Sequence, residues 1–240
     1  MAAEIHPPVL TDFIANPAMH SMHEFWDKYG VSHGDLNNVL NTWLVMGILI
    51  VAAVLVKNKL EMIPRGAQNF WEVVVSTLED IVVQTMGEQG RDYFALIASL
   101  ALFILSCNLI GIIPWFQSST NNLNTTLALA LVSFVTTHYV GIRAHGAHYY
   151  KHFLGPVPWL IPLMLPIELI GHFSRILSLS FRLFGNIMGE DLAIVILTLL
   201  VPYLVPLPMM FLQVFTSFIQ TLVFIMLTMM YIVGSLEEAH

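Results

Sequence analysis

No Asp, Glu, Lys or Arg occurs between Tyr93 and Ile142, a stretch interrupted only by Pro114 and the polar cluster from Gln117 to Thr126. About 20 apolar residues let one helix cross a bilayer. A backbone in lipid must also satisfy its own hydrogen bonds, which a helix does. The stretch therefore predicts a membrane helical hairpin over residues 93–142, with helices at about 93–113 and 125–142.

Composition places the whole chain in the same class. Hydrophobic residues make up 57% of the 240 residues and charged residues only 10%, whereas soluble domains contain about 25% charged residues. The net charge of −7 argues against a nucleic-acid partner. The single cysteine, Cys107, lies inside an apolar run, so we interpret it as a small buried hydrophobe and expect no disulfide.

The remaining segments extend this architecture. We expect an all-α polytopic membrane protein with about five membrane helices and one amphipathic helix at the interface. The predicted segments are an N-terminal extramembrane segment (1–36), a first membrane helix (37–56), the amphipathic helix (67–88), the hairpin (93–142), a cytoplasmic loop (143–158) and a tilted C-terminal helical hairpin that carries the ion path (159–240).

The C-terminal hairpin is unusual in its length. No proline occurs from Ile167 to Val201, and one helix over that range would be about 50 Å long at about 1.5 Å per residue. The apolar core of a bilayer is only about 30 Å thick. We therefore expect a strongly tilted helix, a turn at Pro202–Pro208 and an antiparallel return over Leu207–Val233.

The distribution of basic residues predicts the orientation. If the spans alternate, nearly all basic residues near the helix ends fall on one side, and Lys28 alone falls on the other. Cytoplasmic loops carry the excess of Lys and Arg, which puts the N-terminus outside, in the periplasm, and the C-terminus in the cytoplasm. The basic residues on the cytoplasmic side are Lys57, Lys59, Arg65, Arg91, Arg143 and Lys151.

Polar residues follow one face of the first long C-terminal helix. At 100° per residue, that face carries Glu168, His172, Arg175, Arg182, Asn186 and Glu190, and Asp191 points about a quarter turn further round. A second, uncharged stripe on the returning helix contains Gln213, Ser217, Gln220 and Thr228. A charge at the centre of a bilayer costs about 2.5 to 3.5 kcal/mol on insertion scales, so ionisable residues there are functional by default.

Two interpretations of the stripes remain open. The residues could simply pair within the hairpin, Glu168 with His172 and Arg182 with Glu190 through Asn186. Alternatively they form an ion path, which we favour because arginine stays charged whereas carboxylates and histidines exchange protons. Arg182 would then separate two half-paths.

Other chemistry is poorly supported. His145, His148 and His152 have metal-like spacing but belong to a basic loop, so we expect no metal site. His138, near a span end, is interpreted as an interfacial or buried hydrogen-bonded residue. No phosphate-binding P-loop, zinc-protease or serine-hydrolase motif occurs in the sequence.

The segment from Ser180 to Met188, Ser-Phe-Arg-Leu-Phe-Gly-Asn-Ile-Met, is followed by Gly-Glu-Asp-Leu. It resembles the signature of subunit a of bacterial F-type ATP synthases. The match covers the chain from Pro166 to the C-terminus and, more loosely, all of it. This resemblance implies that Arg182 faces the carboxylate of a rotating c subunit, and that Asn186 and Gln220 correspond to the family asparagine and glutamine.

The resemblance also implies roles for the other polar residues. The acidic position nine after the arginine is Asp191 here, with Glu190 beside it, so either can line the outer half-channel. Gln213 stands where some members have histidine and can only hydrogen-bond. Glu168 and Arg175 fall where some bacterial members place an acid and a base facing the cytoplasm, with His172 between them.

The implied function is ion translocation, most simply of protons, by a stator subunit in the inner membrane of a bacterium. The implied partners are the ring of c subunits, the peripheral-stalk b subunits and the rest of the F-type complex, with no cofactor, no nucleic acid and no bond chemistry in this chain. The alternative is a stand-alone ion-coupled transporter, which the absence of an internal repeat disfavours. A third hypothesis is that the chain is a purely structural membrane scaffold.

Overall fold

The computed structural model describes residues 33–57, 66–113, 116–146, 161–201 and 204–236. These residues form helices and connecting turns, without a strand, which confirms the all-α class. The elements are α3 (His33–Lys57), α4 (Ala67–Met86), the 3₁₀ turn η1 (Glu88–Tyr93), α5 (Phe94–Ile110), the 3₁₀ turn η2 (Ser119–Asn121), α6 (Leu123–His145), α8 (Ile161–Leu200) and α9 (Pro206–Leu236).

Five helical segments of the described chain are long and apolar enough to cross a membrane, as predicted. They are Asn37–Lys57, Glu88–Ile110, Leu123–His145, Pro166–Leu200 and Pro206–Leu236. Most of the expected N-terminal segment (1–36) and of the expected loop (143–158) lies outside the described residues, because these begin at His33 and omit 147–160.

The observed helix ends differ from the sequence expectation in places. Helix α6 begins at Leu123 because the side chain of Asn122 caps it, accepting a hydrogen bond from the backbone N–H of Asn124 at 2.8 Å. Helix α8 begins upstream of Ile167 and continues through Pro166. A proline so near the start of a helix removes only one backbone hydrogen bond of a long ladder.

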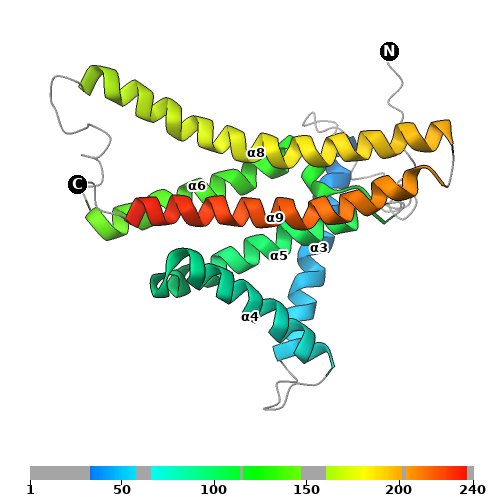
Figure 1. The fold of residues 1–240 in the computed structure, drawn as a ribbon, viewed down its shortest axis with the longest axis horizontal. Helices are drawn as coiled ribbons and strands as arrows, with labels where there is room; N and C mark the ends of the chain where they lie inside the picture. The colour runs from blue at the N-terminus through cyan, green and yellow to red at the C-terminus, as the bar shows by residue number, and fades with distance from the viewer. Residues whose placement is uncertain (1–32, 58–65, 114–115, 147–160, 202–203, 237–240) are drawn as a thin grey trace, which may run out of the picture.

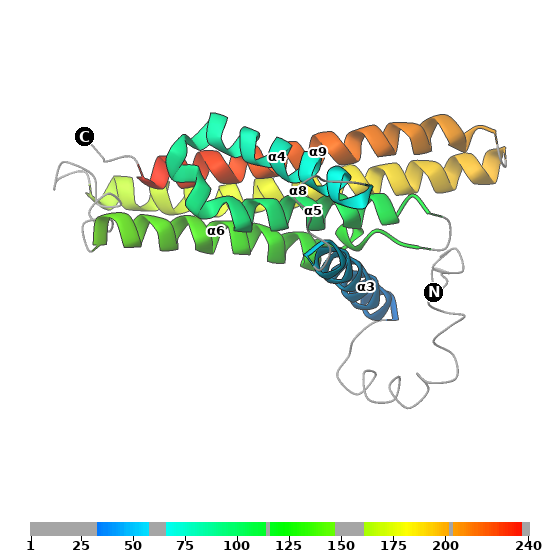
Figure 2. The same cartoon turned by 90° about the horizontal axis from the view of Figure 1, so that it is seen from below.

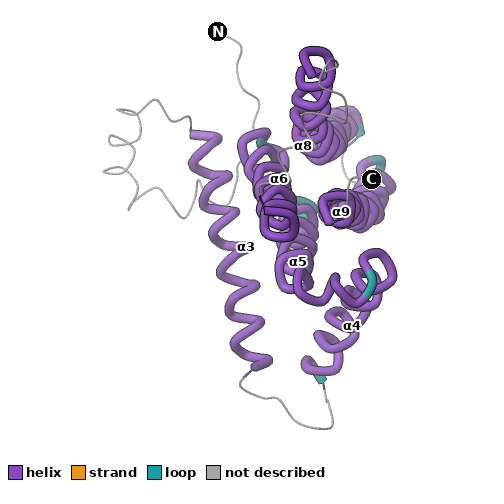
Figure 3. The backbone as a smooth tube through the Cα atoms, turned by 90° about the vertical axis from the view of Figure 1, so that its left-hand side faces the viewer, coloured by secondary structure: helices purple, strands orange, loops and turns teal. Residues whose placement is uncertain are grey.

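Helices α5, α6, α8 and α9 run along a common direction, and α8 and α9 are antiparallel neighbours (Figure 1). Helix α8 is about 60 Å long at about 1.5 Å per residue. Helix α3 crosses this bundle steeply, as the view along the bundle shows (Figure 3), and α4 packs against α5 and α9 (Figure 2). The C-terminal hairpin and the first membrane helix therefore have very different directions.

Four helices meet in one apolar cluster. It contains Leu100 and Ile104 of α5, Leu129 and Ala130 of α6, Leu179 and Leu183 of α8, and Phe224 of α9. Two hydroxyl contacts fix the register around it: Ser133 donates to Thr228 at 2.9 Å, and the Thr126 and Ser180 hydroxyls lie 3.1 Å apart. Because lipid is as apolar as leucine, close packing and such interhelical hydrogen bonds hold membrane helices together.

The turn after α5 is too tight for a side chain at Gly111. A Cβ placed there would lie 2.6 Å from the Cβ of Ser118 and 3.0 Å from its backbone nitrogen. Ser118 cannot retreat freely, because its hydroxyl donates to the carbonyl oxygen of Cys107 at 2.9 Å. We expect Gly111→Ala to destabilise the protein by about 1–3 kcal/mol, measured as a lower thermal denaturation temperature of the purified protein in detergent.

The matched control is Gly47→Ala, at a position in α3 where an added Cβ meets nothing within 4 Å. Alanine is a better helix former than glycine, so this variant should denature at the wild-type temperature or above. Equal denaturation temperatures for the two variants would show that the turn tolerates a side chain.

Candidate functional site

The direction of Arg182 is set by the opposite side of α8. Leu179, Leu183 and Ile187 recur at every fourth position and are 4%, 0% and 0% exposed. Side chains at that spacing share one helix face, which packs into the bundle core. Arg182 and Asn186 consequently fall on the outer face, where both are exposed on the isolated chain.

No side chain of the described part of the molecule neutralises Arg182. None of the described ion pairs or hydrogen bonds includes it, so the pairing with Glu190 considered from the sequence is absent. The flank beside it is also open, since an added Cβ at Gly185 or Gly189 would meet nothing within 4 Å. A guanidinium on an open face of a membrane helix is therefore available to a partner.

Asp191 lies at a junction of three elements. The side chain of Gln213 on α9 donates from Nε2 to one carboxylate oxygen at 2.8 Å. Asn121 of η2 donates from Nδ2 to the other oxygen at 2.8 Å. Gln213 is only 1% exposed, so two amide donors hold this carboxylate in a fixed position.

A second amide contact lies between this junction and Arg182. Asn186 donates from Nδ2 to the side-chain oxygen of Gln220 at 2.8 Å, and Gln220 is buried. Glu190 is different, because its Oε2 is buried and has no hydrogen-bond partner in the described chain, while Thr216 interacts with its carboxyl group. Asn186 and Asp191 of α8 thus contact the uncharged stripe of α9 at Gln220 and Gln213, while Arg182 stays on the outer face.

A second cluster of titratable side chains lies on α8 on the N-terminal side of Arg182. Nε2 of His172 is 3.2 Å from Oε1 of Glu168, a pairing that the sequence left open as an alternative. The guanidinium carbon of Arg175 lies 5.3 Å from the centre of the Tyr231 ring. Along the α8 axis, His172 and Asp191 are about 15 Å and about 14 Å from Arg182, in opposite directions.

Sequence reasoning missed several members of these clusters. Asn121, Thr216 and Tyr231 were not singled out, because each comes from another element and only the packing brings it to α8. Of the loop histidines, His148 and His152 lie outside the described residues, and a ring nitrogen of His145 is 3.2 Å from the carbonyl oxygen of Leu236. Within the described residues, no cluster of three or more metal-type side chains occurs.

A family model described as ATP synthase A chain matches residues 39–233, which includes every element with a polar cluster. The chain belongs to this family. It is similar to ATP synthase subunit a of Trichlorobacter lovleyi, with 50% identity over 98% of this chain and 100% of the relative. It is also similar to ATP synthase subunit a of Geotalea daltonii and of Geobacter sulfurreducens, each with 53% identity over 88% of this chain and 92% of the relative.

Membership in the ATP synthase A chain family agrees with the resemblance seen in the signature around Arg182. Subunit a is a membrane subunit of the F-type complex, and the chemistry of ATP takes place in other subunits. The chain is therefore a component of an ion-driven machine and not an enzyme by itself. The alternative of a stand-alone transporter receives no support from these relatives.

Proposed function

We propose that this chain is the stator subunit that carries ions, most simply protons, past a rotating ring of c subunits through two half-channels. The observation that carries the proposal is the position of Arg182. It is an exposed cation without an acceptor in the described chain, between one carboxylate cluster at Asp191 and another at Glu168. A cation in a membrane helix is costly unless it is paired, so Arg182 requires an anionic partner from another chain.

The outer half-channel consists of Asn186, Glu190, Asp191, Gln213 and Gln220. Protons enter from the periplasm and reach Asp191, whose two oxygens face amide donors. The amide pair of Asn186 and Gln220 lies further toward Arg182 and orients water along the path. The proton then neutralises the carboxylate of a c subunit, which lets that subunit turn into lipid, because a neutral carboxyl group is far cheaper to place there.

Arg182 performs two functions in this scheme. Its fixed positive charge favours the ionised carboxylate of the arriving c subunit, which makes that carboxyl group give up its proton on the other side. Because arginine does not deprotonate in proteins, it also prevents protons from passing directly between the half-channels. The electrical part of the driving force is about 2.3 kcal/mol per charge per 100 mV.

The inner half-channel contains Glu168, His172 and Arg175. We place it on the cytoplasmic side, with the N-terminus in the periplasm and the C-terminus in the cytoplasm, because the basic residues then face the cytoplasm. The host membrane is the inner membrane of a bacterium. Besides the c ring, the partners are the peripheral-stalk b subunits, and the amphipathic helix α4 lies at the membrane interface.

Cross-linking in native membranes tests which face meets the ring. With Cys107 replaced by serine, single cysteines at Ser178 and Gly189 lie on the exposed face that carries Arg182. We expect a photoactivatable maleimide at either position to form an adduct with the c subunit, identified by mass spectrometry. The physical reason is that a ring carboxylate can approach Arg182 only if a c-subunit helix lies against this face.

The matched control is a cysteine at Ile50, which is 58% exposed on α3, a helix that packs mainly against α4, α5 and η2. It should react with the reagent equally well but give no adduct with the c subunit. If the Ile50 position gave the c-subunit adduct and the two α8 positions did not, the proposed face would be wrong.

A further inference from the structure

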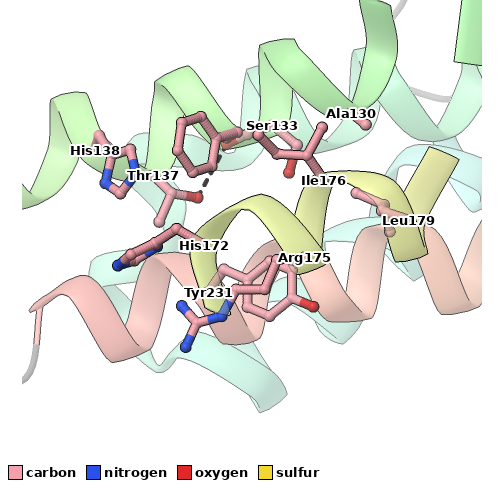
Figure 4. A pocket seen from close by; sticks show the side chains of 10 residues that line it. Ala130, Ser133, Thr137, His138, His172, Arg175, Ile176, Leu179 and Tyr231 are labelled. Carbon is pink, nitrogen blue, oxygen red and sulfur yellow. Dashed lines mark hydrogen bonds between the residues drawn. The ribbon is translucent and has the colours of Figure 1, made fainter. Parts of the chain in front are cut away.

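Helices α6, α8 and α9 line a small, partly open cavity that the signature around Arg182 does not include (Figure 4). Its volume is about 20 Å³, enough for about one water molecule. Alongside apolar side chains it is lined by the polar residues Ser133, Thr137, His138, His172, Arg175 and Tyr231. Its lining surface is mostly apolar, but these residues include enough hydrogen-bonding groups to hold one water molecule.

Two imidazoles from different helices meet at this cavity. The rings of His138 on α6 and His172 on α8 have centroids 5.0 Å apart at an angle of 64°. Phe134 packs edge-on against His138 at 4.1 Å and restricts its ring. Since His172 also contacts Glu168 at 3.2 Å, three neighbouring titratable groups lead from Glu168 across to α6.

The ionisable groups around the histidine pair comprise one acid and one base. The titratable groups that line the cavity with His138 are His172 and Arg175 of α8 and Tyr231 of α9, and Glu168 contacts His172 from its other side. The formal charges of Glu168 and Arg175 sum to zero, so the group of side chains is neutral while both imidazoles are neutral. One added proton can then be shared by the two rings. An imidazole can accept a proton at one nitrogen and release the other from the second nitrogen.

We propose that His138 is a further proton-transferring residue, and that the inner half-path crosses from α8 to α6 through this cavity. The inference rests on the proposed function. A proton released by the c-subunit carboxyl group near Arg182 travels along water in the inner half-path to a ring nitrogen of His172, about 15 Å away along α8. The other N–H of His172 then passes a proton to the cavity water. That water protonates His138, and His138 releases its second N–H proton to water near the end of α6. Each step moves one proton and changes no other bond.

The test compares three substitutions of His138 in inverted membrane vesicles that carry the assembled complex. His138→Phe keeps an aromatic ring against Phe134, His138→Gln keeps hydrogen bonding, and neither can carry a proton. We expect both to lower passive proton conduction, measured after removal of the peripheral ATPase sector, by about tenfold or more. We also expect the dependence of conduction on pH between about 5 and 8, where histidine changes charge, to become flatter.

A third variant, His138→Ala, leaves space for a small ring. Added imidazole should restore much of its conduction, whereas pyrazole, a ring of the same shape that is not protonated near neutral pH, should not. The matched control is His145→Gln, on the same helix, whose ring contacts the Leu236 carbonyl oxygen and not this cavity. It should conduct protons like the wild type.

The outcomes separate this inference from the proposed function. Wild-type conduction in His138→Phe, or restoration of His138→Ala by pyrazole and imidazole alike, would make His138 a packing residue and overturn the inference. The proposed function would survive that result as long as loss of Arg182 still stops pumping. A complex that pumps normally without Arg182 would instead overturn the proposed function.

Discussion

Replacing Arg182 by alanine is expected to abolish ATP-driven proton pumping while the complex still assembles. Pumping should stop because the arriving c-subunit carboxyl group no longer meets a cation that favours its ionised form. Assembly should persist because Arg182 is exposed and has no hydrogen-bond or ion-pair partner in the described chain. Its removal therefore leaves no buried acceptor unpaired.

The measurement is acidification of inverted membrane vesicles on addition of ATP, with the amount of assembled subunit determined by immunoblot. Arg182→Lys is informative as a second variant, because lysine keeps the charge but can lose its proton, so we expect severe loss with an increased passive leak. The control is Arg91→Ala, since Arg91 makes only exposed ion pairs with Glu79 and Glu88 and such pairs contribute little. Normal acidification by Arg182→Ala would refute the proposed function.

The second large effect is expected at Asp191. Replacing it by asparagine should lower ATP-driven pumping by about 10-fold to 100-fold. The substitution removes a group that can carry a proton, and it turns an NH₂ group toward one of the two amide donors that now face the carboxylate oxygens. The measurement is the same vesicle acidification, normalised to assembled subunit.

Glu190→Gln decides which of the two neighbouring carboxyl groups matters more. We expect a smaller loss than for Asp191→Asn, because Asp191 is the one held by donors from both η2 and α9. Asn124→Ala, at an exposed position beside the same turn, serves as the control and should pump normally. A severe defect in Glu190→Gln together with a mild one in Asp191→Asn would assign the outer half-channel to Glu190.

The sequence was sufficient for the class of fold. Long uncharged runs of about 20 residues predict membrane helices because a helix satisfies its own backbone hydrogen bonds in lipid, and the described chain has five helices of that kind. The contact between Glu168 and His172, which the sequence offered as one of two alternatives, is present because residues four apart on one helix are neighbours. Contacts within a single helix can therefore be predicted from the spacing of residues in the sequence.

Contacts between different helices could not be predicted from the sequence in this way. Spacing placed Asn186 on the face of Arg182 and suggested a link to Glu190, whereas the structure pairs Asn186 with Gln220 of α9. Asn121 and His138 reach α8 only because of the directions in which η2 and α6 pack. A single sequence contains the helix periods but not the crossing angles that decide which side chains meet.

The leucine and isoleucine ladder on the inner side of α8 has a consequence for how the subunit can fail. Leu179, Leu183 and Ile187 fix the rotation of the helix about its axis. They thereby fix the direction of Arg182, the only arginine of the signature segment. One extra residue just before Leu183 would turn everything after it by about 100° relative to Arg182. The motor would then stall although every ionisable side chain was still present, so its tolerance to change is limited by ordinary aliphatic packing.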